Sequence, residues 1–197
     1  MTTTTNDTER RIYVADLAAY NAGTLHGVWI DADQDADAIE AEVKAMLRAS
    51  PEPNVEVDCP NCDGGKEPCE VRRCHNGKVP SAEEWAIYGS EGFGQLVGEF
   101  TSFADVAALA AALREHGEVF RLFLENGEEM PEAVERFEEA YCGEWKDEKE
   151  FAWNLLDDMG EIKGDSLAER YFDIDAFTRD LFMGDYWYDS GHVFRRM

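Results

Sequence analysis

The spacing of apolar residues divides the chain into short strands and short amphipathic helices. Residues 11–32 place Ile, Val, Tyr and Trp between polar residues and glycines, which predicts two strands joined by a loop. Apolar residues then recur at every fourth position from Ile39 to Leu47, and this spacing predicts a helix. Residues 54–59 alternate in polarity and predict a third strand, expected to pair with the first two. Residues 11–58 are therefore predicted to form a β-β-α-β unit.

The middle of the chain is predicted to be mainly helical. The spacing of a capping box begins at Ser81 and again at Ser102. These boxes predict a short helix over residues 82–88 and a longer helix that ends near Gly117. Residues 118–127 fit a strand or a helix on periodicity alone.

The last third of the chain predicts three helices and a hairpin. The first helix follows Pro131, and the second is capped by Asp147 and places Met159 on its inward face. The third begins near Ile174. The residues at 189–191 are typical of a hairpin turn.

Together these elements predict an α+β protein made of several small subdomains. The five predicted segments are a disordered tail (1–10), an N-terminal α+β subdomain (11–58), a cysteine-rich, zinc-binding insertion (59–80), a central helical subdomain (81–117) and an acidic C-terminal α+β subdomain (118–197).

The charge of the chain says more about its binding partners than the rest of its composition does. Eighteen Lys and Arg stand against 43 Asp and Glu, for a net charge of −25. Such a surface repels nucleic acid and anionic membranes and attracts basic partners. Over residues 125–175 the count is 18 acidic to 5 basic side chains. Because the aromatic residues of these helices are expected to be buried, the carboxylates are expected to face outward. They are Glu125, Glu128, Glu129, Glu132, Glu135, Glu138, Glu139, Glu144, Asp147, Glu148, Glu150, Asp157, Asp158, Glu161, Asp165, Glu169, Asp173 and Asp175.

Several of these carboxylates are placed where they oppose helix stability. Like charges four residues apart cost a few tenths of a kcal/mol, on the order of what an opposite pair contributes. They occur at Glu128/Glu132, Glu135/Glu139 and Glu144/Glu148. A local rule that is broken repeatedly indicates function. One reading is a surface that imitates DNA phosphates, since 25 net charges match roughly a dozen base pairs. The other is a solvated face that serves solubility.

Four cysteines predict a metal site. Cys59, Cys62, Cys69 and Cys74 have the spacing C-x2-C-x6-C-x4-C, and thiolates two residues apart can share one tetrahedral Zn²⁺ ion. His75 is an alternative to Cys74 as the fourth ligand. Unligated thiols or a redox role are the competing interpretation. The nearby basic side chains, Lys66, Arg72, Arg73 and Lys78, are expected to neutralise the thiolates, with nucleic-acid binding as the alternative.

No constellation typical of an enzyme was found. The N-terminus has no apolar signal segment and no apolar run is long enough to span a membrane, so a cytoplasmic protein is expected. The acidic residues from Asp31 to Asp37 lack the glycine and terminal glutamate of a calcium loop. A carboxylate-metal nuclease is the remaining enzymatic alternative, and no catalytic residue is assigned.

Four strings of the sequence resemble the ArdA antirestriction family. They are "IYVADLAAYNAGTLHGVWIDA" (12–32), "AEEWAIYGSEGFG" (82–94), "FEEAYCGEWKDEKEFAWNLLDD" (137–158) and "YFDIDAFTRDLFMGDYWYDSGHVFRR" (171–196). The resemblance implies an elongated homodimer of three-domain chains in a bacterial host cell. It also implies a helix at 118–127 and an antirestriction motif around 133–145. The cysteine segment departs from the family's usual pattern.

The resemblance also implies a function. Family members imitate bent B-form DNA with surface carboxylates and occupy the DNA-binding core of type I restriction-modification enzymes, formed by the methyltransferase and specificity subunits. They thereby protect incoming plasmid, transposon or phage DNA and evade host defence without catalysis. The alternative is a zinc-stabilised acidic adaptor that binds another basic, DNA-binding partner.

Overall fold

The computed structural model describes residues 9–127, 130–160 and 170–196. The chain divides into two compact units, Met1–Arg114 and Glu115–Met197. Helices and small antiparallel sheets occur in both, which confirms the predicted α+β class. The five-segment division and the elongated shape stay predictions.

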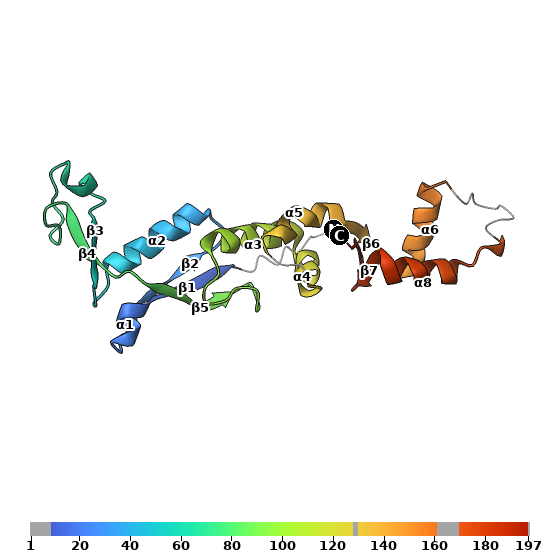
Figure 1. The fold of residues 1–197 in the computed structure, drawn as a ribbon, viewed down its shortest axis with the longest axis horizontal. Helices are drawn as coiled ribbons and strands as arrows, with labels where there is room; N and C mark the ends of the chain where they lie inside the picture. The colour runs from blue at the N-terminus through green and yellow to red at the C-terminus, as the bar shows by residue number, and fades with distance from the viewer. Residues whose placement is uncertain (1–8, 128–129, 161–169, 197) are drawn as a thin grey trace. The chain divides into compact units, whose positions relative to one another are not determined.

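The first unit is built on a three-stranded antiparallel sheet (Figure 1). Its central strand β1 (Arg11–Asp16) lies between β2 (Gly27–Asp31) and β5 (Trp85–Glu91). Helix α2 (Ala36–Arg48) packs against β1 and β2. The apolar side chains of this layer are fully buried, and they include Ile12, Val14, Ile30, Ile39 and Val43.

Two caps connect these elements. Asp16 is fully buried, and its Oδ1 accepts hydrogen bonds from the backbone N–H groups of Ala18 and Ala19 at the start of the short helix α1 (Leu17–Asn21). Asp35 caps α2 by accepting a hydrogen bond from Ala38. The helix predicted from the Ile39 spacing is confirmed.

Two predictions for this unit are wrong. Residues 54–59 do not join the first two strands, because β3 (Val55–Asp58) pairs with β4 (Lys78–Ser81) in a separate hairpin. Residues 82–88 do not form a helix. The Oγ of Ser81 donates to the carbonyl of Ala82 instead of capping a helix, and β5 supplies the second partner that β1 requires. Long-range strand pairing therefore overrides a local capping signal.

The prediction that residues 1–10 form a disordered tail does not hold for its last residue, Arg10. Residues 1–8 lie outside the described residues, but Arg10 is only 8 % exposed. Its Nη2 donates to the carbonyl of Leu113 and its Nη1 contacts Asp33. Residue 10 is therefore part of the packed unit.

Helix α3 (Phe103–His116) confirms the second capping box. The Oγ of Ser102 accepts a hydrogen bond from the backbone N–H of Asp105 at 3.1 Å and donates to its carboxylate at 2.6 Å. The predicted inward residues Val106, Leu109 and Leu113 are buried. The helix ends immediately before Gly117, as predicted.

The second unit begins with two helices. They are α4 (Glu118–Glu125) and α5 (Glu132–Ala140), so the segment that was ambiguous on periodicity is helical, as the family resemblance implied. Three Phe rings form the core between them: Phe120, Phe123 and Phe137.

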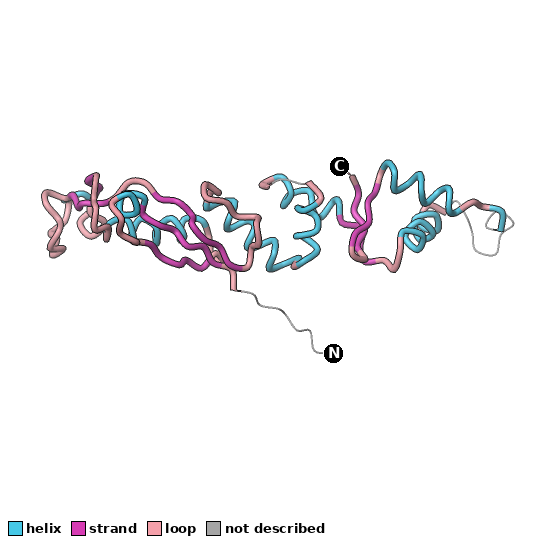
Figure 2. The backbone as a smooth tube through the Cα atoms, turned by 90° about the horizontal axis from the view of Figure 1, so that it is seen from below, coloured by secondary structure: helices cyan, strands magenta, loops and turns pink. Residues whose placement is uncertain are grey.

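The described part of the second unit continues with a sheet and with the helices α6 and α8 (Figure 2). Strand β8 (His192–Arg195) lies between β6 (Tyr141–Glu144) and β7 (Tyr186–Asp189). The predicted hairpin between β7 and β8 is confirmed. Helices α6 (Glu148–Asp158) and α8 (Ile174–Gly184) pack against each other.

Met159 is not on an inward face. Its side chain is 61 % exposed, because α6 ends at Asp158 and Met159 is the C-cap. The buried face of α6 is formed by Phe151, Ala152 and Leu156.

We expect Phe137→Ala to destabilise the second unit by about 3 to 5 kcal/mol, because the removed ring is 2 % exposed and its loss leaves a cavity among aromatic rings. Urea unfolding followed by tryptophan fluorescence measures the change. Met159→Ala is the control and should change the free energy of unfolding by less than about 0.5 kcal/mol. Equal effects of the two substitutions would contradict the described core.

Candidate functional site: an acidic surface and a four-cysteine centre

The second unit exposes its carboxylates as the sequence predicts. Of the 18 carboxylates named above, Glu128, Glu129, Glu161, Asp165 and Glu169 lie outside the described residues. All the others are exposed: Glu125, Glu132, Glu135, Glu138, Glu139, Glu144, Asp147, Glu148, Glu150, Asp157, Asp158, Asp173 and Asp175. We call these thirteen residues the acidic surface.

On helix α5 the buried apolar residues and the exposed glutamates occupy different faces. Its buried residues are Ala133, Phe137 and Ala140, three or four positions apart. The glutamates fill the positions between them and are exposed. One stripe of the helix therefore packs on aromatic rings while the rest presents carboxylates to solvent.

Five members of the acidic surface have a structural partner. Asp147 and Asp173 cap α6 and α8 by accepting hydrogen bonds from Glu150 and Ala176 at 2.8 and 3.0 Å. The remaining three contacts join Glu150 to the backbone N–H of Lys146, Asp175 to Lys149 and Glu138 to His116.

The other eight carboxylates have no basic partner among the described residues. They are Glu125, Glu132, Glu135, Glu139, Glu144, Glu148, Asp157 and Asp158. Glu132, Glu135 and Glu148 lie in the first turns of α5 and α6, where the helix dipole favours negative charge. The other five lie in no first turn of a helix, so their retention requires another explanation.

The aromatic residues between positions 137 and 151 lie beneath the acidic surface, in the interior of the second unit. Phe137 and Phe151 are buried, whereas Tyr141 and Trp145 are half-buried. Trp145 donates its indole N–H to the carbonyl of Cys142 at 2.9 Å. The Tyr141 hydroxyl lies 3.0 Å from Nδ1 of His192, and burial raises the pKa of Tyr141. The predicted core role of Phe137 and Phe151 is therefore confirmed.

Cys142 is a packed thiol in this region. Its Sγ donates to the carbonyl of Ala140 at 3.4 Å, and burial raises its pKa. A raised pKa keeps the thiol protonated and poorly nucleophilic.

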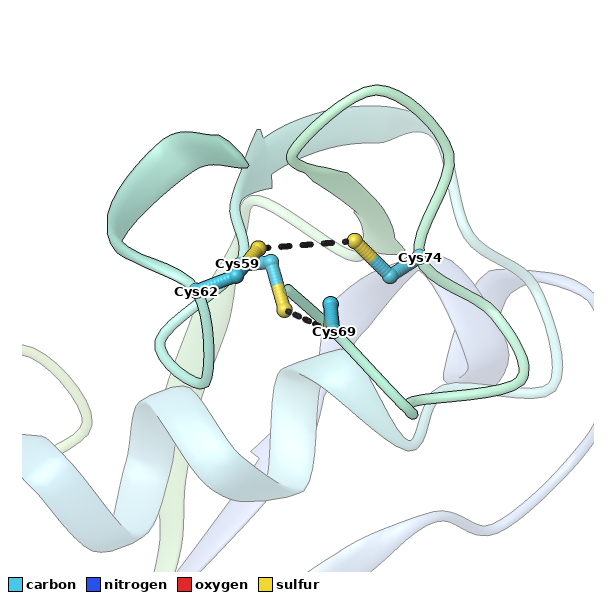
Figure 3. Close-up of side chains that lie close together, drawn as sticks. All are labelled: Cys59, Cys62, Cys69 and Cys74. Atoms are coloured by element: carbon cyan, nitrogen blue, oxygen red, sulfur yellow. Dashed lines mark hydrogen bonds between the residues drawn. The ribbon is translucent and has the colours of Figure 1, made fainter. Parts of the chain in front are cut away.

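The second feature is a cluster of four cysteines in the first unit (Figure 3). The Sγ atoms of Cys59, Cys62, Cys69 and Cys74 all lie within 4.8 Å of one another. Two Sγ–Sγ distances, from Cys59 to Cys69 and from Cys62 to Cys74, are 3.6 and 3.7 Å. A tetrahedral ion with Zn–S bonds of about 2.3 Å requires sulfur separations of about 3.8 Å. A disulfide requires about 2.05 Å, and all four thiols are free.

The hairpin formed by β3 and β4 positions these thiols. Cys59 directly follows β3, and its backbone N–H donates to the carbonyl of Gly77 at 2.8 Å. Cys62 precedes the short 3-10 turn η1 (Asp63–Gly65). A backbone hydrogen bond therefore joins the start of the cysteine segment, at Cys59, to its end, at Gly77.

Gly77 is a functional residue that sequence reasoning missed. Its φ is +79°, and a Cβ built there would lie 2.2 Å from the carbonyl carbon of Gly64. Only glycine permits this approach. The Asn76-Gly77 pair, which is typical of tight turns, was the available signal.

The apolar core around the thiols is small. Beyond the four cysteines it contains Val57, Val71 and Val79. Burial and the neighbouring thiols raise the pKa of Cys74 to about 12, and burial raises the pKa of Cys62. Burial acts in the same direction on Cys59, but hydrogen bonds from the Asn61 backbone and the other thiols outweigh it and lower the pKa of Cys59. The thiols of Cys62 and Cys74 thus stay protonated without a countercharge, whereas a divalent cation would stabilise the thiolates. The donor set, spacing and small core fit a structural metal.

The structure also places the polar neighbours of the four-cysteine cluster. His75 is exposed and lies outside the four-cysteine cluster. Lys66 and Lys78 form ion pairs with Asp63 and Asp58 at 2.6 and 2.7 Å. These lysines are engaged by carboxylates, so neutralisation of the thiolates does not account for them.

The alternating aspartates near the start of the chain have structural partners. Asp33 pairs with Arg10 and Arg114, and Asp31 accepts a hydrogen bond from the backbone N–H of Asp33. Within the described ranges, the only group of three or more His, Cys, Asp or Glu placed to hold a metal is the four-cysteine cluster. No helix in the described part of the chain is long and apolar enough to cross a membrane.

We expect Gly77→Ala to weaken metal binding by about tenfold or more, because the new methyl group would displace the Gly64 backbone. Competition with a colorimetric chelator measures the affinity. Gly23→Ala is the control, since Gly23 has a φ of +82° but no atom within 4 Å of the added Cβ. It should show only the conformational cost of about 1 to 2 kcal/mol and unchanged metal affinity. Unchanged affinity in both variants would contradict the close approach.

Comparison with models of known protein families gives a match to this chain. A family model described as "Antirestriction protein (ArdA)" matches residues 12–194, a range that includes the acidic surface and the four cysteines. No curated protein matches the sequence. The match covers nearly all of the chain, and the chain therefore belongs to the ArdA antirestriction protein family.

Proposed function

We propose that the chain is an antirestriction protein that competitively occupies the DNA-binding site of type I restriction-modification enzymes. The observation that carries the proposal is the acidic surface, in which eight exposed carboxylates have no basic partner among the described residues. Family membership supplies the target class. The carboxylates would occupy the positions that DNA phosphates take in the groove formed by the methyltransferase and specificity subunits.

Binding of this kind requires no catalysis. Phosphate contacts supply a distributed, sequence-independent part of the affinity of DNA-binding proteins. A protein that offers carboxylates on helices gains the same attraction from the same Lys and Arg residues. Because the contacts are many and individually weak, affinity should decrease with salt and no single carboxylate should be decisive.

The direct test is displacement of DNA. A fluorescent duplex that contains the recognition sequence is bound to the purified methyltransferase-specificity core, and the chain is added. Loss of anisotropy in proportion to added chain, with a half-displacement concentration that rises when more labelled duplex is present, supports competitive mimicry. Retention of the duplex while the chain binds elsewhere on the core would overturn it.

The same assay separates the alternative function. A zinc-stabilised acidic adaptor would bind another basic partner through the same carboxylates and would leave the duplex on the restriction enzyme. The chain would then still bind basic proteins in a salt-dependent manner.

We also propose that Cys59, Cys62, Cys69 and Cys74 hold a structural Zn²⁺ ion. Their convergence supports this assignment. Zinc bound by four thiolates would supply folding energy to a hairpin whose own apolar core is small.

The remaining parts of the proposal concern the cellular setting. They are a homodimer, a location in the cytoplasm of a bacterial host, and protection of phage or mobile-element DNA. Family membership supports them. Sedimentation of the purified chain tests the dimer directly, and a monomer at micromolar concentration would contradict it.

A further inference from the structure

The basic side chains of the first unit are paired with carboxylates, with three exceptions. Residues 9–114 contain nine Lys and Arg. Six of them form ion pairs: Arg10, Arg11, Lys44, Lys66, Lys78 and Arg114. The other three are Arg48, Arg72 and Arg73, and none of them has a carboxylate within ion-pair distance in the described part of the chain.

Two of these arginines lie on the cysteine hairpin, and one of the two contacts the backbone at the end of α2, where the third lies. Arg72 and Arg73 are exposed on the stretch between Cys69 and Cys74. Nη1 of Arg73 donates to the carbonyl of Arg48 at 3.3 Å, at the last residue of α2. The hairpin fold thus brings together arginines that are 24 and 25 residues apart in sequence.

Arg72 and Arg73 line a depression of the protein surface. It has a volume of about 490 Å³ and is lined by Arg72, Arg73, His75, Pro80 and a single carboxylate, Glu56. A smaller depression of about 160 Å³ shares Arg73 and Pro80 with it and is lined by Arg48. We call these two adjoining depressions, with the side chains of Arg48, Arg72, Arg73 and His75 that line them, the basic pocket.

In a chain with 43 acidic and 18 basic residues, a pocket lined by three arginines without ion pairs and by one carboxylate, Glu56, is an exception to the general excess of acid. Their mutual repulsion would be relieved by a bound oxyanion. A guanidinium donates two parallel hydrogen bonds to a phosphate, and a phosphate monoester carries nearly two negative charges on three acceptor oxygens. A single carboxylate would satisfy only one of the arginines.

We propose that the basic pocket binds a phosphate group. The site is separate from the acidic surface and does not depend on the antirestriction proposal. Two sources supply the same chemistry, a free phosphate-bearing small molecule and the backbone of a nucleic acid. The net charge of the chain repels a nucleic acid at long range, but this repulsion is screened beyond about 8 Å at physiological salt.

The experiment uses the four histidines of the full chain as reporters. Their imidazole proton signals are followed by NMR at fixed pH and fixed ionic strength while chloride is replaced by inorganic phosphate. His75 lines the pocket, whereas His26, His116 and His192 do not. A saturable shift of the His75 signal alone is the expected result. A second titration uses a short single-stranded DNA oligonucleotide without terminal phosphates.

Two variants with the same change in charge separate the pocket from general electrostatics. Arg72→Gln with Arg73→Gln removes two unpaired cations of the pocket. Lys66→Gln with Lys78→Gln removes two cations of the same hairpin that already pair with carboxylates. We expect the first variant to weaken phosphate binding by about tenfold or more and the second by less than about threefold. Zinc content, measured in both, shows that the hairpin stays folded.

The outcomes are distinguishable. A His75 response to inorganic phosphate identifies a small-molecule site, and a response to the oligonucleotide alone identifies a backbone site; both support the proposal. Equal losses in the two variants, or equal shifts of all four histidines, would overturn it. So would a His75 signal that responds to neither probe.

Discussion

Neutralising the eight unpaired carboxylates together should reduce inhibition of a type I restriction enzyme by about 1000-fold. The variant replaces Glu125, Glu132, Glu135, Glu139, Glu144 and Glu148 with Gln and Asp157 and Asp158 with Asn. If each exposed charge contributes about 0.5 kcal/mol to binding, the eight contribute about 4 kcal/mol, or nearly three factors of ten in affinity. Each single substitution should change inhibition by less than about threefold. The measurement is the concentration of chain that halves DNA cleavage.

A control variant separates the surface from net charge. It neutralises eight exposed carboxylates of the first unit: Glu9, Asp37, Glu52, Glu67, Glu70, Glu83, Glu84 and Glu99. Its net charge matches that of the first variant, but its acidic surface is intact. Inhibition should fall far less. Equal losses would mean that total charge, rather than the acidic surface, determines binding.

The variant that loses the eight unpaired carboxylates should be about as stable as the natural chain, because it loses both repulsion between glutamates and the helix-dipole stabilisation of Glu132, Glu135 and Glu148. Glu135 and Glu139 lie four residues apart on α5 and repel each other, at a cost of a few tenths of a kcal/mol. The gain from removing this repulsion and the loss of first-turn carboxylates are of similar size, so the midpoint of urea unfolding should change little while inhibition is lost. A decrease in both quantities would instead indicate that the substitutions damage the fold.

Replacing Cys62 with Ser should abolish zinc binding and unfold the hairpin between β3 and β4. Structural zinc in small modules contributes about 10 to 16 kcal/mol, and a serine hydroxyl does not ionise to replace a thiolate. The protein should contain one zinc ion per chain, and Cys62→Ser should contain almost none. Hydrogen exchange of residues 55–81 should accelerate strongly, because the remaining apolar core includes only three valines. A strong chelator should have the same effect.

His75→Ala is the matched control for the metal site. His75 is exposed and lies outside the cluster, so zinc content should stay at one ion per chain. Inhibition of the restriction enzyme should survive Cys62→Ser, because the acidic surface belongs to the second unit. Full zinc content in Cys62→Ser would contradict ligation by Cys62. A purified protein with five free thiols and no metal would favour the thiol interpretation over zinc.

Local signals predicted the elements whose partners are close in sequence. Ser102 and Asp147 cap helices as their positions suggested, and the turn at Ser190 joins adjacent strands. The four cysteines also converge, because their spacing already carries the constraint of a shared centre.

The errors arise where distant segments decide the structure. Residues 82–88 carry a capping signal, yet strand β5 pairs with β1, which lies about seventy residues earlier in the chain. The β3 segment has a strand pattern that does not specify its partner, and β4 rather than β1 takes that place. The basic pocket joins Arg48 of α2 to the cysteine hairpin, and periodicity carries no information on such a contact.

The most direct test of the central proposal is ATP-dependent cleavage of unmodified DNA by a purified type I restriction enzyme, titrated with the chain. The proposal predicts inhibition that is complete near one chain dimer per enzyme and is relieved when the DNA concentration is raised. Full cleavage in the presence of a large excess of folded chain would contradict it.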